Sequence, residues 1–544
     1  MMKHLSIALI LLISANHSWA DTYPKNPNID ILNYTFRIQL SDATDVIVSE
    51  ATIDVRYLAA GEQSLRLDLV RASQELGNKG MVVIGVASED RALNFTHKDD
   101  VLMIQLPAPS AKNQRTSYKV SYKGIPATGL KIANNKHGDR TFFSDNWPDK
   151  GRNWLPTVDH PYDKATCEFI VTAPAHYQVV SNGLMIEESD LPDGYRLTHW
   201  KQSVPIATWL YVLGVARFAV QQVDQFDNKS IETWVYYQDR EAGFYDFAIP
   251  TKKALAYYSD YVGPFSYEKL ANIQSNSVSG GMEAASAILY SENSVVGDRN
   301  VRWRNVVIHE IAHQWFGNAV TEYDWDDVWL SEGFATYFTL LFIEHEYGHD
   351  AFMQGLASSK KSVDAFYEKN PNYRIVHDNL SDMSKVTSSN TYQKGSWILH
   401  MLRGVVGTDN FWKGIRSYYK KYKDLNATTD DFRREMEEAS GMDLKDFFQQ
   451  WLYQPGILKF KGSCTYDKKK KEISITLDQV QTDGSLFKMP MELGIYLKDK
   501  QPMMKVIQVN EKSNVFTIAV DAEPEKVVLD PNNWVLMDAE FGRK

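Results

Sequence analysis

The pattern of hydrophobic and polar positions divides the chain into three parts. From residue 21 to about residue 215, short segments alternate apolar with polar residues, and glycine, proline and asparagine separate them. Such alternation is typical of strands that turn one face toward a core. The predicted strands are 34–40, 51–57, 101–106, 117–122, 168–172 and 209–220. We therefore predict a large all-β domain over residues 21–215.

After Pro250 the apolar residues recur three and four positions apart, which is the spacing of one helix face. The predicted helices are 251–262, 301–318, 326–347, 392–406 and 429–451. Gln454-Pro455-Gly456 interrupts this pattern, and alternation returns, as at 473–478. We predict a mainly helical domain over 216–455 and a small β-sandwich of five to seven strands over 456–544. The expected fold class is therefore multidomain α+β.

The first twenty residues have the features of a secretory signal peptide. Lys3 and His4 precede a mostly apolar run over 5–13, and Ser18-Trp19-Ala20 places small residues where a signal peptidase cleaves. The apolar run is too short for a membrane span, and no later stretch reaches eighteen consecutive apolar residues. We expect cleavage near Ala20 and export to the periplasm or the outside of the cell, without a membrane span.

Composition narrows the possible partners. The 544 residues include 69 acidic and 59 basic side chains, and the net charge of −10 argues against nucleic acid. With 44% hydrophobic residues, packed domains are expected throughout. The two cysteines, Cys167 and Cys464, fall in different predicted domains. A disulfide and two separate thiols therefore remain alternatives. The sequence indicates no oligomeric state.

Candidate metal ligands lie in the helical part. His309 and His313 are four positions apart on a predicted helix, so both imidazoles can reach one ion. Glu332, on the next predicted helix, would complete a two-His, one-carboxylate site with an open position for water. An open position is typical of catalytic zinc, so we expect one Zn²⁺ per chain. Glu310 lies beside the first ligand and could deprotonate zinc-bound water, which indicates hydrolysis.

Three motifs in matching order resemble the gluzincin aminopeptidase family, that of aminopeptidase N and leukotriene hydrolase. The zinc segments are 309–318 and 329–335. The second motif is Gly280-Gly281-Met282-Glu283, and the third is Tyr392-Gln393-Lys394-Gly395. The resemblance spans nearly the whole chain after the signal peptide. It implies a β-rich, saddle-shaped N-terminal domain, a thermolysin-like and mainly helical catalytic domain, and a small C-terminal β-sandwich.

The resemblance also implies how substrate would be bound. Glu283 would pair with the free α-ammonium of a peptide through charge-assisted hydrogen bonds. Gly280, Gly281 and Met282 would let the peptide backbone approach a strand edge. The Tyr392 hydroxyl would donate to the oxyanion opposite the metal. We therefore expect a zinc metallo-aminopeptidase that removes the N-terminal residue from peptides with a free N-terminus.

Three features depart from the family pattern. Ala284 stands where the family usually has asparagine, a loss that could loosen Glu283 or reshape the first subsite. Within 143–148, where many relatives bring a glutamine to the substrate N-terminus, this chain has Asp145. Asp145 could supply a second carboxylate for the ammonium, or it could cap its own loop. Many relatives continue into a helical domain after the β-sandwich, so a more open site is expected here.

Two other functions remain as alternatives. A thermolysin-like endopeptidase would keep the zinc ligands but have no use for Glu283. A catalytically inactive peptide-binding protein would need neither a base nor an oxyanion donor, and the presence of Glu310 and Tyr392 argues against it. Blocking the substrate N-terminus distinguishes the first alternative from an aminopeptidase.

Overall fold

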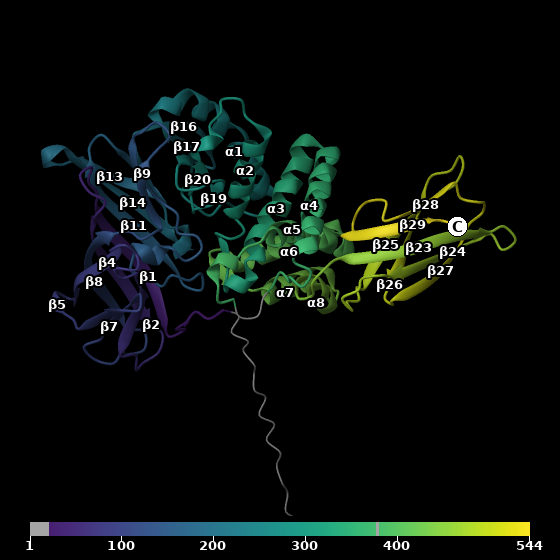
Figure 1. The fold of residues 1–544 in the computed structure, drawn as a ribbon, viewed down its shortest axis with the longest axis horizontal. Coiled ribbons are helices and arrows are strands. Elements are labelled where there is room, and N and C mark those ends of the chain that lie inside the picture. The colour runs from purple at the N-terminus through teal and green to yellow at the C-terminus, as the bar shows by residue number, and fades with distance from the viewer. Residues whose placement is uncertain (1–20, 377–379) are drawn as a thin grey trace, which may run out of the picture.

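The computed structural model describes residues 21–376 and 380–544, so the predicted signal peptide lies outside the described residues. A β-rich N-terminal part, a helical middle and a C-terminal part made of strands follow one another along the long axis (Figure 1). This arrangement confirms the multidomain α+β class. Buried hydrophobic side chains from all three parts form one contiguous core. No helix in the described ranges is long and apolar enough to cross a bilayer.

The N-terminal part is built from three sheets. The largest has the order β13-β14-β11-β1-β2-β8-β4-β5, the second β12-β15-β10-β9, and the third β3-β7-β6. The strands are β1 Ile29–Gln39, β2 Ile47–Tyr57, β3 Ser64–Asp68, β4 Gly80–Ser88, β5 Arg91–Ala92, β6 Phe95–Lys98, β7 Val101–Gln105, β8 Arg115–Ile125, β9 Leu130–Asn134, β10 Arg140–Ser144, β11 Lys164–Pro174, β12 Gln178–Ser181, β13 Leu184–Asp190, β14 Tyr195–Ala207 and β15 Leu213–Ala216.

The predicted strands are found in this part, with one correction. In β2 every second residue is buried, which is the burial that the alternating sequence predicts. The predicted strand over 209–220 is wrong as a single element. Its start belongs to a short 3-10 helix, Thr208–Leu210, and the rest is divided between β15 and β16, with exposed Arg217 between them. The run is apolar because most of it is buried, so periodicity alone did not show the break.

Among its described residues, the middle part combines a five-stranded sheet with eight α-helices. The sheet has the order β16-β17-β18-β20-β19, and a separate parallel pair joins β21 and β22. The strands are β16 Phe218–Phe226, β17 Lys229–Tyr236, β18 Lys269–Ser275, β19 Gly281–Met282, β20 Ala287–Ser291, β21 Val320–Glu322 and β22 Leu425–Ala427. The helices are α1 Arg240–Tyr261, α2 Val301–His313, α3 Trp329–Tyr347, α4 His349–Lys369, α5 Ser389–Val406, α6 Thr408–Tyr422, α7 Thr429–Ser440 and α8 Lys445–Leu452.

Several helix boundaries differ from the predicted ones for local reasons. The predicted helix 429–451 is two helices, α7 and α8, because Gly441 ends α7 in a left-handed conformation. The predicted helix 251–262 is the second half of α1, whose backbone leaves the helical conformation at Ile249, before Pro250. Helix α2 ends at His313, five residues earlier than expected. Helices α4 and α6 were not predicted.

The C-terminal part contains seven strands in two sheets, β27-β24-β23-β29 and β26-β25-β28. The strands are β23 Leu458–Asp467, β24 Glu472–Gln479, β25 Met489–Tyr496, β26 Met503–Val509, β27 Ser513–Ala519, β28 Lys526–Leu529 and β29 Met537–Arg543. Cys464 lies in β23 and Cys167 in β11, and both are buried free thiols.

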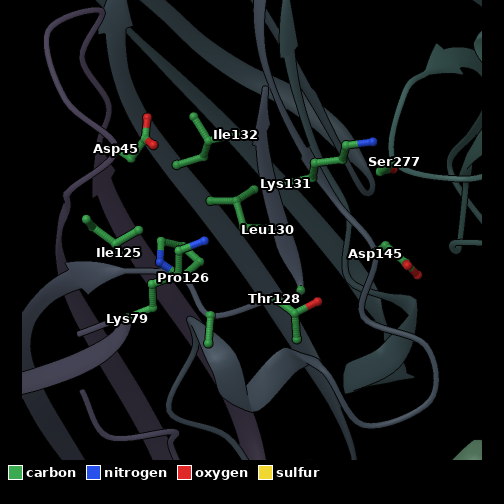
Figure 2. A pocket seen from close by; sticks show the side chains of 12 residues that line it. Asp45, Lys79, Ile125, Pro126, Thr128, Leu130, Lys131, Ile132, Asp145 and Ser277 are labelled. Carbon is green, nitrogen blue, oxygen red and sulfur yellow. The ribbon is translucent and has the colours of Figure 1, made fainter. Parts of the chain in front are cut away.

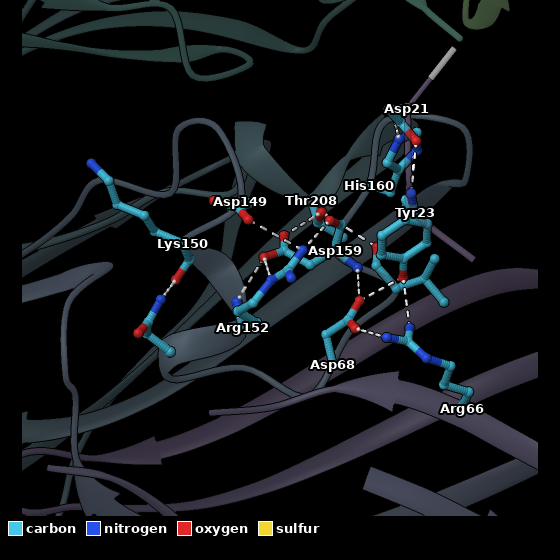
Figure 3. Close-up of polar contacts among 12 residues, drawn as sticks. Asp21, Tyr23, Arg66, Asp68, Asp149, Lys150, Arg152, Asp159, His160 and Thr208 are labelled. Carbon is cyan, nitrogen blue, oxygen red and sulfur yellow. Dashed lines mark hydrogen bonds and ion pairs between the residues drawn. The ribbon is translucent and has the colours of Figure 1, made fainter. Parts of the chain in front are cut away.

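Residues 21–25 connect the N-terminal part to the helical middle. The Asp21 carboxylate lies 2.6 Å from Nε2 of His160, next to the ring of Tyr23 (Figure 3). The Lys25 ammonium lies 2.8 Å from Asp21 and 2.8 Å from Asp324, which precedes α3. All three ionic side chains are nearly fully buried, so this connection is part of the core between the two parts.

Candidate active site

The two candidate histidine ligands project from the last turns of α2. The Asn300 side chain accepts a hydrogen bond from the backbone N–H of Arg302 and so caps the start of this helix. The four-residue spacing of His309 and His313 places their rings on one face, and the two Nε2 atoms are 3.1 Å apart. Two imidazole nitrogens at this distance can share one proton or bind one cation between them.

Glu332, from the first turn of α3, completes the group. Its Oε2 atom lies 3.2 Å from His313 Nε2 and 3.5 Å from His309 Nε2. A tetrahedral zinc ion with bonds of about 2.0–2.2 Å holds its ligand atoms roughly 3.3 Å apart. The three ligand atoms therefore already have the separations that zinc requires, and the residues fit this metal.

The charges around these ligands also favour a cation. Burial alone would raise the pKa of Glu332, but the facing imidazoles of His313 and His309 lower it to about 2. Burial alone would lower the pKa of His313, but the carboxylates of Glu283 and Glu332 raise it to about 10. Both shifts arise from the mutual attraction between the imidazoles and the carboxylates that face them.

A residue that sequence reasoning missed orients His313. The Nδ1 atom of His313 lies 3.0 Å from Ser331 Oγ and 3.1 Å from the carbonyl oxygen of Phe316. These contacts favour the tautomer with hydrogen on Nδ1, which leaves Nε2 free for the metal. Gly317 makes room for this arrangement, since a Cβ there would be 2.2 Å from Ser331 Oγ. The only sequence signal was the position of Ser331 next to Glu332.

The candidate base Glu310 lies under the Gly280–Glu283 segment. Its side chain is buried against Gly281, where an added Cβ would come within 2.1 Å of Glu310 Oε1. Gly281 and Met282 form β19, the last strand of the five-stranded sheet, and pair with β20 on one side. The other edge of β19 has no partner strand within residues 21–376 and 380–544. The predicted strand edge is therefore present directly above Glu310.

Glu283 lies at the end of this segment, close to the metal ligands. Its Oε1 atom is 3.8 Å from His313 Nδ1. Burial raises the pKa of Glu283 to about 7, and the charges of Glu332 and Asp145 add to the effect. Its carbonyl oxygen accepts hydrogen bonds from the side-chain amides of Gln314, at 3.0 Å, and Asn318, at 2.6 Å. These amides hold the main chain of Glu283 although the next residue is alanine.

Tyr392 reaches the site from the first turn of α5. The Ser388 and Thr391 side chains form a capping box that starts this helix. The Tyr392 hydroxyl donates a 2.7 Å hydrogen bond to Glu332 Oε1, and its ring stacks near that of His309, with centroids 6.1 Å apart. The structure therefore brings a phenolic donor beside the candidate metal ligands.

Asp145 lies farther out, directly after β10. It borders a hollow of about 270 Å³, and Figure 2 shows it on the same side of this hollow as Ser277. Ser277 Oγ donates to the carbonyl oxygen of Ser144 at 3.0 Å, which ties this strand to the segment before Gly280. The Asp145 carboxylate forms a 2.8 Å ion pair with Lys150. Its position near Glu283 agrees with either of its two predicted roles.

The sequence of the chain matches models of a known protein family. The Peptidase M1 N-terminal domain matches residues 31–210, and the Peptidase family M1 domain matches residues 247–451. Glutamyl aminopeptidase of Homo sapiens is 31% identical over 343 residues, which are 60% of this chain and 36% of the human protein. The Sus scrofa protein is 30% identical over 326 residues, 58% of this chain and 34% of that protein.

Another relative aligns over more of the chain. Probable aminopeptidase 2 of Sulfurisphaera tokodaii is 26% identical over 448 residues, 78% of this chain and 56% of that protein. The chain spans about a third of the length of the mammalian relatives. The two domain matches together cover well over half of the chain, in the order that the motifs predict. The chain therefore belongs to peptidase family M1.

Proposed function

We propose that this protein is a zinc-dependent aminopeptidase that hydrolyses the N-terminal residue from peptides. The observation that carries this proposal is the convergence of three groups at one strand edge. The ligand atoms of His309, His313 and Glu332 lie 3.1–3.5 Å apart. Glu310 and Glu283 are buried beside them, with ligand atoms within 4.8 Å of His313. This set supplies a metal site, a base and an anchor for an ammonium group.

Zinc held by His309, His313 and Glu332 would act as a Lewis acid toward water and the scissile carbonyl. Glu310 would accept a proton from the attacking water and return it to the leaving amine. The absence of a side chain at Gly281 leaves the Glu310 carboxylate directly beneath the strand edge where the peptide would lie. This would bring the proposed base within reach of the reacting carbonyl.

Tyr392 would donate a hydrogen bond to the oxygen that becomes negative in the transition state. In the structure its hydroxyl already donates to Glu332 Oε1 at 2.7 Å. A small rotation of the side chain would exchange this acceptor for the developing oxyanion. A donor that is held by the protein before reaction needs little reorganisation, which is the main source of such stabilisation.

Glu283 would set the register of cleavage by binding the α-ammonium. A peptide that pairs with the free edge of β19 brings its first residue next to Glu283. The neighbouring carboxylates of Glu310 and Asp145 would add negative charge at this end of the site. A substrate ammonium would balance this buried charge, whereas a blocked N-terminus would leave it unpaired.

The test is hydrolysis of fluorogenic aminoacyl amides and their N-acetylated twins by the wild-type protein and by the Glu310→Gln and Glu283→Gln variants. We expect cleavage of the free substrates only, loss of cleavage with a chelator, and loss in Glu310→Gln. Glu283→Gln should raise KM for free substrates and abolish the preference over acetylated ones. Equal cleavage of both forms by the wild type would indicate an endopeptidase. No cleavage by zinc-loaded protein would indicate a peptide-binding protein.

Finer features of the family resemblance are part of the same proposal. We propose a saddle-shaped N-terminal domain, a thermolysin-like catalytic domain and a C-terminal β-sandwich. The three sheets before β16, the helices around α2 and α3, and the two sheets after α8 support these assignments. We also propose export after cleavage near Ala20, on the strength of the apolar run over 5–13.

A further inference from the structure

We propose that Gly395 is a positioning residue, and that its direct backbone contact with Gly333 sets the place of the Tyr392 hydroxyl relative to Glu332. The inference rests on the proposed peptidase function, because it concerns the oxyanion donor of that reaction. It follows from how helices α3 and α5 cross.

The two helices touch through their backbones at this crossing. A Cβ on Gly395 would lie 2.9 Å from the Cα of Gly333, and a Cβ on Gly333 would lie 3.0 Å from the Cα of Gly395. Packed helices are usually separated by side chains, with axes about 8–10 Å apart. At this point no side chain separates them. An alanine at either position would therefore force the helices apart, because backbone atoms cannot rotate out of the way.

Each glycine lies within three residues of a side chain of the candidate site. Gly333 directly follows Glu332 on α3, and Gly395 lies three positions after Tyr392, on the same face of α5. The Tyr392 hydroxyl and Glu332 Oε1 are joined by the 2.7 Å hydrogen bond. The crossing therefore lies within three residues of both Glu332 and Tyr392, and the separation of the two backbones sets how far the Tyr392 hydroxyl lies from Glu332.

The other face of α5 is also fixed. Nε2–H of His400 donates to the carbonyl oxygen of Asn533 at 3.0 Å. Trp534 covers Gly404, where a Cβ would be 2.9 Å from the indole ring. Helix α5 is therefore held between α3 and the C-terminal part of the chain. Added volume at Gly395 would move the start of α5, where Tyr392 lies, away from α3.

Added volume at Gly395 should affect the proposed oxyanion donor, Tyr392, more than the candidate zinc ligands. His309 and His313 lie on α2 and Glu332 on α3, so none of the three candidate zinc ligands belongs to α5, although Glu332 accepts the hydrogen bond from Tyr392. A shift of about 1 Å in a catalytic group can reduce the rate roughly 100-fold. Gly395→Ala should therefore weaken oxyanion stabilisation while zinc binding and substrate binding persist.

A double-mutant cycle tests this on the full mature chain with an aminoacyl amide substrate. Gly395→Ala should lower kcat about 10- to 100-fold with KM within about threefold and zinc content unchanged. If the loss arises through Tyr392, adding Gly395→Ala to Tyr392→Phe should lower kcat by no more than about threefold further. Gly404→Ala is the matched control, since it adds the same methyl group to α5 at a site where the nearest atom, also 2.9 Å away, belongs to the Trp534 side chain and not to a backbone. Its kcat should stay within about threefold of wild type.

Additive losses in the cycle, an equal loss in Gly404→Ala, or an unchanged kcat in Gly395→Ala would each overturn the proposal. If Gly395→Ala does not fold, Gly333→Ala adds the same contact from the other helix and replaces it in the cycle. Crystal structures of the zinc-loaded wild type and of the zinc-loaded Gly395→Ala variant show the position of the Tyr392 hydroxyl without any measurement of turnover. An unmoved Tyr392 hydroxyl would refute the positioning role. Zinc-loaded wild type that cleaves no aminoacyl amide would refute only the proposed function.

Discussion

Gly281 and Glu310 are in such close contact that a Cβ at position 281 would lie 2.1 Å from the Glu310 Oε1 atom and 2.4 Å from its Cγ atom. The two residues come from different elements, β19 and α2, and meet where the free strand edge passes over the candidate base. The missing side chain at position 281 is therefore what lets the carboxylate reach the strand edge.

The first prediction concerns this contact. A Gly281→Val variant should push the Glu310 side chain away from the strand edge and lower kcat about 100-fold, the typical loss for a displaced general base. Zinc content, measured by atomic emission, should remain at one ion per chain, because Glu310 is not one of the three converging ligands. A variant with kcat close to that of the wild type would show that Glu310 acts from another position.

The second prediction concerns Tyr392. Tyr392→Phe removes the hydroxyl that donates to Glu332 but keeps the ring that stacks on His309. We expect kcat to fall about 100- to 1,000-fold, as when an oxyanion donor is lost, with little change in KM. Steady-state kinetics on one aminoacyl amide checks this. A rise in KM at constant kcat would instead assign Tyr392 to substrate binding.

The third prediction concerns the support of His313, a candidate metal ligand. Ser331→Ala removes the hydroxyl that lies 3.0 Å from His313 Nδ1. Loss of such a partner should weaken zinc binding about 10-fold, because the ring is less firmly held in the required tautomer. Competition with a chromogenic chelator measures the affinity. Ser362→Ala, on the exposed face of α4, is the matched control, and an equal effect in both variants would contradict the assignment.

The fourth prediction concerns the pH dependence of stability. His400 is buried between Tyr337 and the Asn533 carbonyl, and burial is the main cause that lowers its pKa to about 3, with help from Arg403 and His349. Between the ordinary pKa of about 6.5 and this value, the unfolded chain binds a proton that the folded chain does not. Stability should therefore fall as the pH falls through this window, by at most about 1.4 kcal/mol per pH unit from this group.

Urea unfolding at a series of pH values measures this effect. In His400→Gln the decrease between about pH 6 and pH 4 should be smaller than in the wild type, because one titrating group has been removed. His176→Gln replaces an exposed histidine and should leave the decrease unchanged. An identical pH profile for all three proteins would show that His400 is not held neutral in the fold.

Hydrophobic periodicity along the sequence was sufficient to predict many of the helices and strands. The alternation in β2 was readable because this strand has one buried face. Helices α3 and α5 were also predicted, although they are buried on most sides, at nearly every position of 329–343 and 394–402. The short strand β19 has only two residues and no period, so its pairing with β20 could be seen only in the folded chain. Helices α4 and α6 were not predicted, although their buried residues have the same three-and-four spacing, at 352, 356, 359 and 363 in α4 and at 411, 415, 418 and 419 in α6.

The sequence by itself determined which side chains could do chemistry, because the four-residue spacing of His309 and His313 is a property of one helix and needs no partner. Only the tertiary structure decided that Glu332 and Tyr392, sixty residues apart, meet at that helix. Their meeting depends on which helices cross and how closely, and this is set by packing between distant segments, such as the contact of Gly333 with Gly395. A period along one segment carries no information about the neighbour that will pack against it.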